Sequence, residues 1–184
     1  MAEPLVAMLA AGKATRFGGR KLEAACAGKP LGRWAVEAAE SAGLGPGVIV
    51  TGPDGVSFAR GWTRLTNLRP DEGLGTSLAI AARHALDEGR ETMIVMLADM
   101  PLVQPGLLKA LAAAPAPMAS LHRRGPGVPA LLDRRLIVAA AGLTGDRGLA
   151  PMLRNVGTLP AGTTLFDVDT AEDLAEAERQ LLAR

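Results

Sequence analysis

Short, unbroken apolar runs separated by helix-like segments constrain the fold of this 184-residue chain more than any other feature. Residues 4–9 and 93–97 are almost entirely apolar, which is typical of strands that are buried on both faces of a parallel sheet. A third run at 48–50 is shorter, and 62–66 is a weaker strand candidate. Strands that alternate with helices over this length predict one three-layer α/β domain, residues 1–184, with a mostly parallel sheet.

Helix signals lie between these strand candidates. Pro30 suits the first position of a helix that runs to about residue 42. Thr76 or Ser77 is a candidate cap for a helix at 78–88. In the last helix, Thr170 and Asp173 have the spacing of a capping box. The other expected elements are helices at 105–114 and 149–153 and strands at 118–121 and 128–132.

The segment that follows the first strand combines small residues with cations. It reads Leu9-Ala10-Ala11-Gly12-Lys13-Ala14-Thr15-Arg16-Phe17-Gly18-Gly19-Arg20-Lys21. Backbone N–H groups can approach an anion where side chains are absent, and cations can close on it from the sides. This composition indicates a nucleoside triphosphate site, although a solvated turn has the same residues. The spacing is not that of a Walker loop, because Phe17 stands five residues after Gly12.

Composition limits the other classes of function. Few aromatic residues (3 %) argue against a stacking platform for single-stranded nucleic acid. A net charge of +1 gives nucleic acid or a membrane surface no electrostatic attraction to this chain. Cys26 is the single cysteine, so an intrachain disulfide and a cysteine-based zinc site are excluded. Since the sequence shows neither a signal peptide nor an apolar stretch of roughly 18 residues, we expect a cytoplasmic protein.

Two aspartates stand where ligands bind in open α/β sheets, beyond the carboxyl ends of strands. Asp99 follows the apolar run at 93–97, and a carboxylate there is costly to bury unless a cation meets it. Asp99 is therefore a candidate Mg²⁺ ligand, since Mg²⁺ prefers carboxylate and phosphate oxygens together; a loop or capping role is the alternative. Asp169 directly precedes the last helix. A carboxylate there is also explained by helix capping alone. For Asp169 to bind a metal, it would have to lie close to Asp99.

Six motifs in this order resemble the MobA-like nucleotidyltransferases, most closely the molybdenum cofactor cytidylyltransferase branch. They are L-A-A-G-x-x-x-R-F-G-G-x-K at 9–21, G-K-P-L at 28–31, E-G-L-G-T-S-L at 72–78, L-A-D-M-P-L-V at 97–103, L-T-G-D-R-G at 143–148 and D-V-D-T-A-E-D-L at 167–174. The resemblance covers nearly the whole chain. It implies a Rossmann-like α/β fold that transfers NMP from an NTP to a phosphorylated acceptor and releases pyrophosphate.

The resemblance also implies roles for individual residues. Arg16 and Lys21 would bind the triphosphate and act in catalysis with Asp99. Asp99 and Asp169 would hold Mg²⁺. The residues expected to bind the nucleotide or border the acceptor are Leu9, Ala10, Ala11, Gly12, Lys21, Gly75 and Ser77.

The resemblance defines the nucleotide base and the acceptor less narrowly than it defines the reaction. Ala11 favours CTP, because guanylyl-transferring members usually have glycine at this position. Molybdopterin is the expected acceptor, although the cytidylyl branch often has Gly-His-Pro where this chain has Val128 between Gly127 and Pro129. The alternatives are GTP, a sugar or alcohol phosphate, or a non-catalytic nucleotide-binding partner of a molybdoenzyme or its chaperone. Four arginines are either solvated charges or, in some cases, contacts to an anionic acceptor: Arg123, Arg124, Arg134 and Arg135.

Overall fold

A computed structural model describes residues 3–12, 17, 19–162 and 165–184. Within them, a sheet has the strand order β5-β4-β1-β6-β8-β7-β9. Neighbouring strands are parallel except around β8, which is antiparallel to both β6 and β7. The mostly parallel sheet is therefore confirmed. The strands are β1 (Leu5–Ala10), β4 (Val48–Thr51), β5 (Thr63–Thr66), β6 (Thr92–Leu97), β7 (Met118–His122), β8 (Gly125–Asp133) and β9 (Gly157–Pro160).

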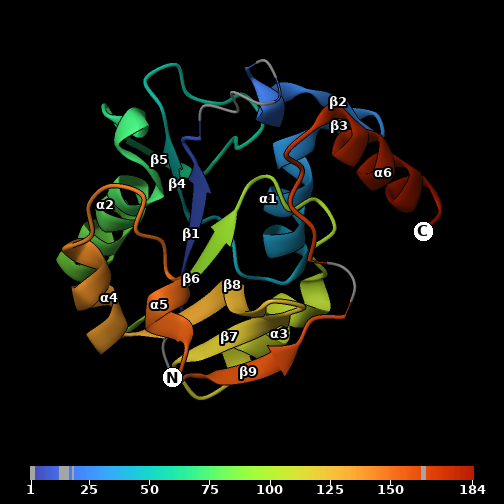
Figure 1. Ribbon diagram of the computed structural model, residues 1–184. Coiled ribbons are helices and arrows are strands. Elements are labelled where there is room, and N and C mark those ends of the chain that lie inside the picture. The colour runs from blue at the N-terminus through green and yellow to red at the C-terminus, as the bar shows by residue number, and fades with distance from the viewer. Residues whose placement is uncertain (1–2, 13–16, 18, 163–164) are drawn as a thin grey trace.

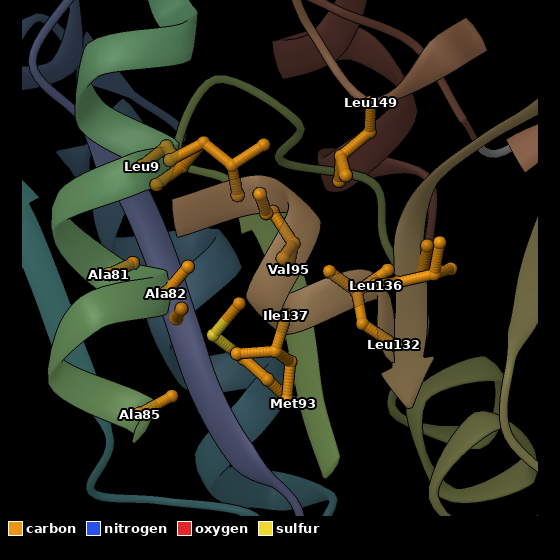
Figure 2. Packing of buried hydrophobic residues seen from close by; sticks show 14 of the residues in the cluster. Leu9, Ala81, Ala82, Ala85, Met93, Val95, Leu132, Leu136, Ile137 and Leu149 are labelled. Carbon is orange, nitrogen blue, oxygen red and sulfur yellow. The ribbon is translucent and has the colours of Figure 1, made fainter. Parts of the chain in front are cut away.

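Helices cover both faces of this sheet, as Figure 1 shows. Alternate residues of β1 enter different cores: Ala7 packs with α2 and α4 on one face, and Met8 packs with α1 and α3 on the other. Figure 2 shows the first of these cores, where Ala81, Ala82 and Ala85 of α2 face the sheet. The Rossmann-like three-layer arrangement is thus confirmed. The helices are α1 (Leu31–Ser41), α2 (Leu74–Asp87), α3 (Pro105–Ala113), α4 (Arg134–Ala141), α5 (Ala150–Leu153) and α6 (Ala171–Leu182).

The strand order reverses between β1 and β6, and this position determines where a ligand can bind. From β1 the chain continues through α1 to β4 on one side, and it later returns to β6 on the other. At the carboxyl ends of the two strands, the Ala98 N–H donates to the Leu9 carbonyl at 3.1 Å. A crevice at such a switch point is the usual ligand site of an open α/β sheet.

A third apolar cluster fixes α6 and the segment before it. Val168, Ala177 and Leu181 pack there with Cys26 of a small hairpin, β2 (Ala25–Cys26) and β3 (Lys29–Pro30). The capping box at Thr170 is confirmed, with both of its hydrogen bonds present. Because the Val168 N–H also donates to the Asp99 carbonyl at 3.0 Å, the start of α6 lies at the end of β6.

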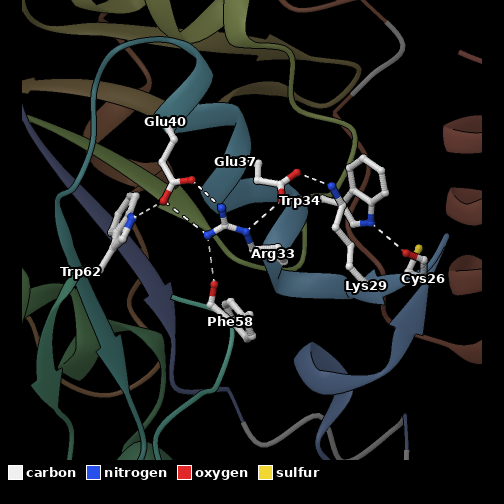
Figure 3. A network of polar contacts seen from close by, with 8 residues as sticks. All are labelled: Cys26, Lys29, Arg33, Trp34, Glu37, Glu40, Phe58 and Trp62. Carbon is white, nitrogen blue, oxygen red and sulfur yellow. Dashed lines mark hydrogen bonds and ion pairs between the residues drawn. The ribbon is translucent and has the colours of Figure 1, made fainter. Parts of the chain in front are cut away.

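A polar network ties α1 to the hairpin and to the chain before β5 (Figure 3). The Trp34 indole donates to the Cys26 carbonyl at 2.9 Å, and the Trp62 indole donates to Glu40 at 3.1 Å. Arg33 pairs with Glu40 and Glu37 on its own helix. These contacts hold the hairpin and the chain before β5 against one helix.

Several boundaries differ from those expected. α2 begins at Leu74 instead of residue 78, because Gly73 (φ 101°) ends the preceding 3₁₀ turn, η3 (Pro70–Glu72), and takes the N-cap position. Thr76 and Ser77 therefore lie inside the helix and do not cap it. The helix α4, the strand β9 and the β2–β3 hairpin were not expected. In the part of the chain that the structure describes, no helix has both the length and the apolarity that crossing a membrane requires.

Candidate active site

Lys21 joins two of the predicted carboxylates at the switch point. Its Nζ lies 2.9 Å from Asp99 Oδ2 and 3.3 Å from Asp169 Oδ1. Only 8 % of Lys21 is exposed, whereas the side chain of Asp169 is 55 % exposed. Lys21 lies in the short 3₁₀ helix η2 (Lys21–Glu23) after the glycine-rich loop. The fold thus brings together three predicted residues that are far apart in the sequence.

The other carboxylate oxygen of Asp99, Oδ1, is buried and accepts no hydrogen bond within the described residues. A buried acceptor of this kind calls for a partner. A divalent cation fits, because Asp99 and Asp169 already share one cation, the Lys21 ammonium. Among the described residues no three acidic, histidine or cysteine side chains gather closely enough to hold a metal by themselves. Mg²⁺ commonly binds through one or two carboxylates plus substrate phosphates, so these residues suit a metal that arrives with a nucleotide.

Asp167 is a third carboxylate in this cleft, and the sequence reasoning missed it. It stands two residues before Asp169 in a segment that belongs to no helix or strand, and Val168 between them is fully buried. Asp167 and Asp169, on either side of this buried residue, both border the cavity that contains Lys21 and Asp99. Partial removal from water raises the pKa of Asp167, and the negative charge of Asp99 raises it further. The D-x-D alternation around an apolar residue was the signal that could have identified it.

We expect Asp167→Asn to stabilise the protein at pH 7. A raised pKa means that the folded state binds more protons than the unfolded state as Asp167 titrates, so the free energy of unfolding falls as pH rises through that range. The gain is a few tenths of a kcal/mol, because solvent reaches part of the carboxyl. Denaturant titrations at pH 7 and pH 3 measure it. The gain should vanish at pH 3, and an equal gain at both values would contradict the electrostatic origin.

Three connected cavities run along the carboxyl edge of the sheet. The central one, of about 270 Å³, contains Lys21 and Asp99. It shares Ala10, Ala11 and Gly12 with a cavity of about 370 Å³ that extends to residues 52–56. On its other side it shares Leu9 and other residues with a more apolar cavity of about 230 Å³. The predicted site residues at the end of β1 and directly after it therefore all border the central cavity: Leu9, Ala10, Ala11 and Gly12.

Gly75 and Ser77 lie behind these cavities and do not line them. Ser77 is 3 % exposed, and its hydroxyl accepts a hydrogen bond from Asn67 at 2.9 Å. The Gly75 N–H donates to the Gly145 carbonyl at 2.9 Å. In this structure both residues hold the start of α2, Gly75 against the 143–148 loop and Ser77 against Asn67; their contact with substrate stays a prediction.

A Gly75→Ala substitution should destabilise the protein by about 1–3 kcal/mol, the usual cost of overpacking. A Cβ at Gly75 would lie 2.7 Å from the carbonyl oxygens of Gly145 and Arg147. Gly106 is the matched control, since it is also the second residue of a helix and a Cβ there would meet open space. Denaturant unfolding should show no loss for Gly106→Ala. Equal effects of the two changes would contradict the packing role.

Two groups of predicted basic residues have other outcomes. Arg16, like Lys13, lies outside the described residues, so its expected contact with the triphosphate remains a prediction. Arg134 pairs with Glu91 at 3.3 Å, and the neighbouring Asp133 is in register with Thr92 at the start of β6. Since the cleft lies at the opposite end of β6, Arg134 does not contact an acceptor there. The expectation that some of the four arginines do stays a prediction for the other three.

Comparison with known proteins defines the class of this chain. Residues 6–161 match the family model of the MobA-like NTP transferase domain. The chain therefore belongs to this family, which confirms the resemblance drawn from its motifs.

Two curated proteins show sequence similarity to this chain. The bifunctional protein GlmU of Xanthobacter autotrophicus is 36 % identical over 130 residues, which cover 64 % of this chain and 28 % of GlmU. The chain thus spans about a quarter of the length of the GlmU relatives it matches. The purine catabolism protein PucB of Bacillus subtilis is 28 % identical over 178 residues, 89 % of this chain and 86 % of PucB.

Solved structures share the fold at lower identity. A nucleotidyl transferase from Methanothermobacter superposes with a TM-score of 0.82 at 22 % identity and covers 100 % of this chain and 99 % of its own. The manganese complex of Rv0371c from Mycobacterium tuberculosis gives a TM-score of 0.75 at 22 % identity, over 97 % and 99 % of the two chains. At these identities the likeness establishes the fold alone.

Proposed function

We propose that this protein transfers CMP from CTP to the phosphate of molybdopterin and releases pyrophosphate. Membership of the MobA-like NTP transferase family supports nucleotidyl transfer. One observation carries the proposal: a buried lysine and two carboxylates meet at the switch point, and one oxygen of Asp99 has no partner among the described residues. That combination suits a polyanion and a divalent cation bound together.

In this reaction the protein has to neutralise negative charge, whereas proton transfer is of little importance. An acceptor phosphate oxygen attacks the α-phosphorus in line, and pyrophosphate leaves on the opposite side. Both reactants are anions, so cations that approach them lower the barrier. Lys21, at the edge of the central cavity, is positioned to meet the triphosphate, and we assign Arg16 to the same task. A phosphate nucleophile is already ionised near pH 7, so the reaction needs no general base.

Asp99 and Asp169 would hold Mg²⁺ in this scheme. When bound, the metal would polarise the α-phosphate and offset the charge of the approaching acceptor phosphate. Lys21 would then have to leave at least one of the two carboxylates and turn toward the phosphates. The manganese complex of Rv0371c is consistent with a divalent metal in this fold.

The base is assigned to the cavity of about 370 Å³ beside residues 52–56. Ala11 lines this cavity, and a methyl group there leaves less room than the glycine of the L-A-G-G pattern. A smaller pocket favours a pyrimidine over a purine, which supports CTP over GTP.

Incubation of the protein with Mg²⁺, molybdopterin and each of the four NTPs tests this function through pyrophosphate release. We expect CTP to be consumed fastest. Faster consumption of GTP would overturn the base assignment while nucleotidyl transfer stands. If no NTP released pyrophosphate with molybdopterin, a sugar phosphate or an alcohol phosphate, the protein would instead be a non-catalytic nucleotide-binding partner.

A further inference from the structure

The segment 52–58, which follows β4, belongs to no helix or strand, and its residues 52–56 form one wall of the cavity of about 370 Å³. The short helix η2 contributes another wall of the same cavity. A segment without regular structure makes few backbone hydrogen bonds of its own, so the side chains that hold it determine its shape. The contacts of segment 52–58 therefore decide how wide this cavity is.

Arg64 of β5 holds the beginning of this segment. Its Nε donates to the Thr51 hydroxyl at 3.1 Å, and its Nη2 donates to the carbonyls of Gly52 and Pro53. The guanidinium also lies against Gly55, where a Cβ would be 2.7 Å from Nη1 and where the backbone has φ +71°. The first half of the segment is thus fixed to the strand that lies beside β4.

Phe58 fixes the other end of the segment to α1. Its side chain is buried, and a Cβ at Gly32 of α1 would lie only 2.3 Å from its ring. Its carbonyl accepts from Arg33 at 3.3 Å, as Figure 3 shows. These contacts keep the segment attached to the fold independently of its polar contacts with η2.

Glu23 joins the segment to η2. One of its carboxylate oxygens, Oε1, accepts from the Ser57 N–H at 2.7 Å, and the other, Oε2, accepts from the Ser57 hydroxyl at 2.6 Å. We call this pair of hydrogen bonds the Glu23–Ser57 clasp. Since Glu23 and Lys21 are the two ends of η2, the clasp connects the wall of one cavity to the helix whose lysine binds Asp99.

We propose that Glu23 is a positioning residue for the nucleotide base, acting through Ser57. The inference rests on the proposed function, in which the base occupies this cavity. A wall that is ordered before the nucleotide arrives lowers the entropy cost of binding. Because Lys21 belongs to the same short helix, the clasp also fixes the spacing between the base wall and the cation that meets the triphosphate.

A comparison of Glu23→Ala with Glu23→Gln isolates the clasp from the charge. Both changes remove the negative charge, but glutamine keeps both hydrogen bonds, because Oε1 can accept from the Ser57 N–H and Nε2 can donate to its hydroxyl. We expect Glu23→Ala to bind CTP, or GTP if the wild type prefers it, roughly 3- to 10-fold more weakly than Glu23→Gln. Tripolyphosphate, which has no base, should bind both variants equally. Isothermal titration calorimetry measures both ligands.

Variants of Ser57 test the same contact from the other side. Ser57→Ala removes the hydroxyl and keeps the N–H, so it should weaken nucleotide binding by a smaller factor than Glu23→Ala. Ser57→Thr keeps a hydroxyl and should restore the affinity. Ser41→Ala is the matched control, because Ser41 is an exposed serine at the end of α1 and is remote from the lining of this cavity. Amide hydrogen exchange over 52–58 should be faster in Glu23→Ala than in Glu23→Gln.

Pyrophosphate release separates this inference from the proposed function. If the two Glu23 variants bind the nucleotide equally, or differ as much with tripolyphosphate as with the nucleotide, the positioning role is overturned, and nucleotidyl transfer still stands. Weaker nucleotide binding in Glu23→Ala alone, without pyrophosphate release from any NTP, would support the positioning role and refute the enzymatic function.

Discussion

Asp99→Asn will reduce metal-dependent pyrophosphate release from CTP at least a hundredfold while the fold survives. The change removes the charge of the carboxylate whose Oδ1 has no partner among the described residues, and it keeps the shape of the side chain. Loss of one preorganised electrostatic contact to a reacting group typically costs 10²–10³ in rate. Steady-state assays at saturating CTP, together with circular dichroism, measure the effect.

Asp87→Asn is the matched control for this change. Asp87 is an exposed residue at the end of α2, and the same loss of charge there should leave turnover unchanged. Retained turnover in Asp99→Asn would refute the metal assignment. Equal losses in the two variants would show that net charge, rather than the site, governs the rate.

Lys21→Met should have opposite effects on metal binding and on turnover. In the absence of nucleotide, the Lys21 ammonium stands between Asp99 and Asp169, where a divalent ion would bind. Its removal takes away the cation that both carboxylates bind, so we expect Mn²⁺ to bind the free protein more tightly. Triphosphate binding should weaken by about 1.5–3 kcal/mol, the range for a hydrogen bond to a charged group, and turnover should fall with it.

Titration of Mn²⁺ by electron paramagnetic resonance, with and without CTP, separates the two effects. Lys109→Met, an exposed change on α3, controls for the loss of one positive charge. Mn²⁺ affinity that is unchanged or reduced in Lys21→Met would contradict competition between lysine and metal. Unchanged affinity for CTP would contradict the contact with the triphosphate.

The sequence predicted the parallel part of the fold because its signals are local. The run at 93–97 is continuously apolar, and burial on both faces of a sheet selects such a run directly. The helix α4 was missed because Asp133 ends β8 and also caps α4, accepting from the Leu136 N–H at 2.8 Å, so no turn marks the boundary. The strand β9 was missed because most of its residues are exposed, and its pairing with β7 is a long-range contact.

The site was predictable to the extent that motifs mark it. Asp99 and Lys21 stand in motifs of the family, and the structure brings them within 2.9 Å of each other. Asp167 and His122 were overlooked, since their place beside the cleft depends on burial of Val168 and on the pairing of β7 with β8. Ser77 lies inside α2, which begins four residues earlier than its cap signals suggest, and its hydroxyl accepts from Asn67; its expected contact with substrate stays a prediction.

Anomalous diffraction from crystals grown with Mn²⁺ and a non-hydrolysable CTP analogue tests the site most directly. We predict one manganese peak bound by Asp99 and an α-phosphate oxygen, with the Lys21 ammonium moved onto the triphosphate. A nucleotide bound elsewhere on the sheet, or a manganese ion that leaves Asp99 uncoordinated, would contradict this account.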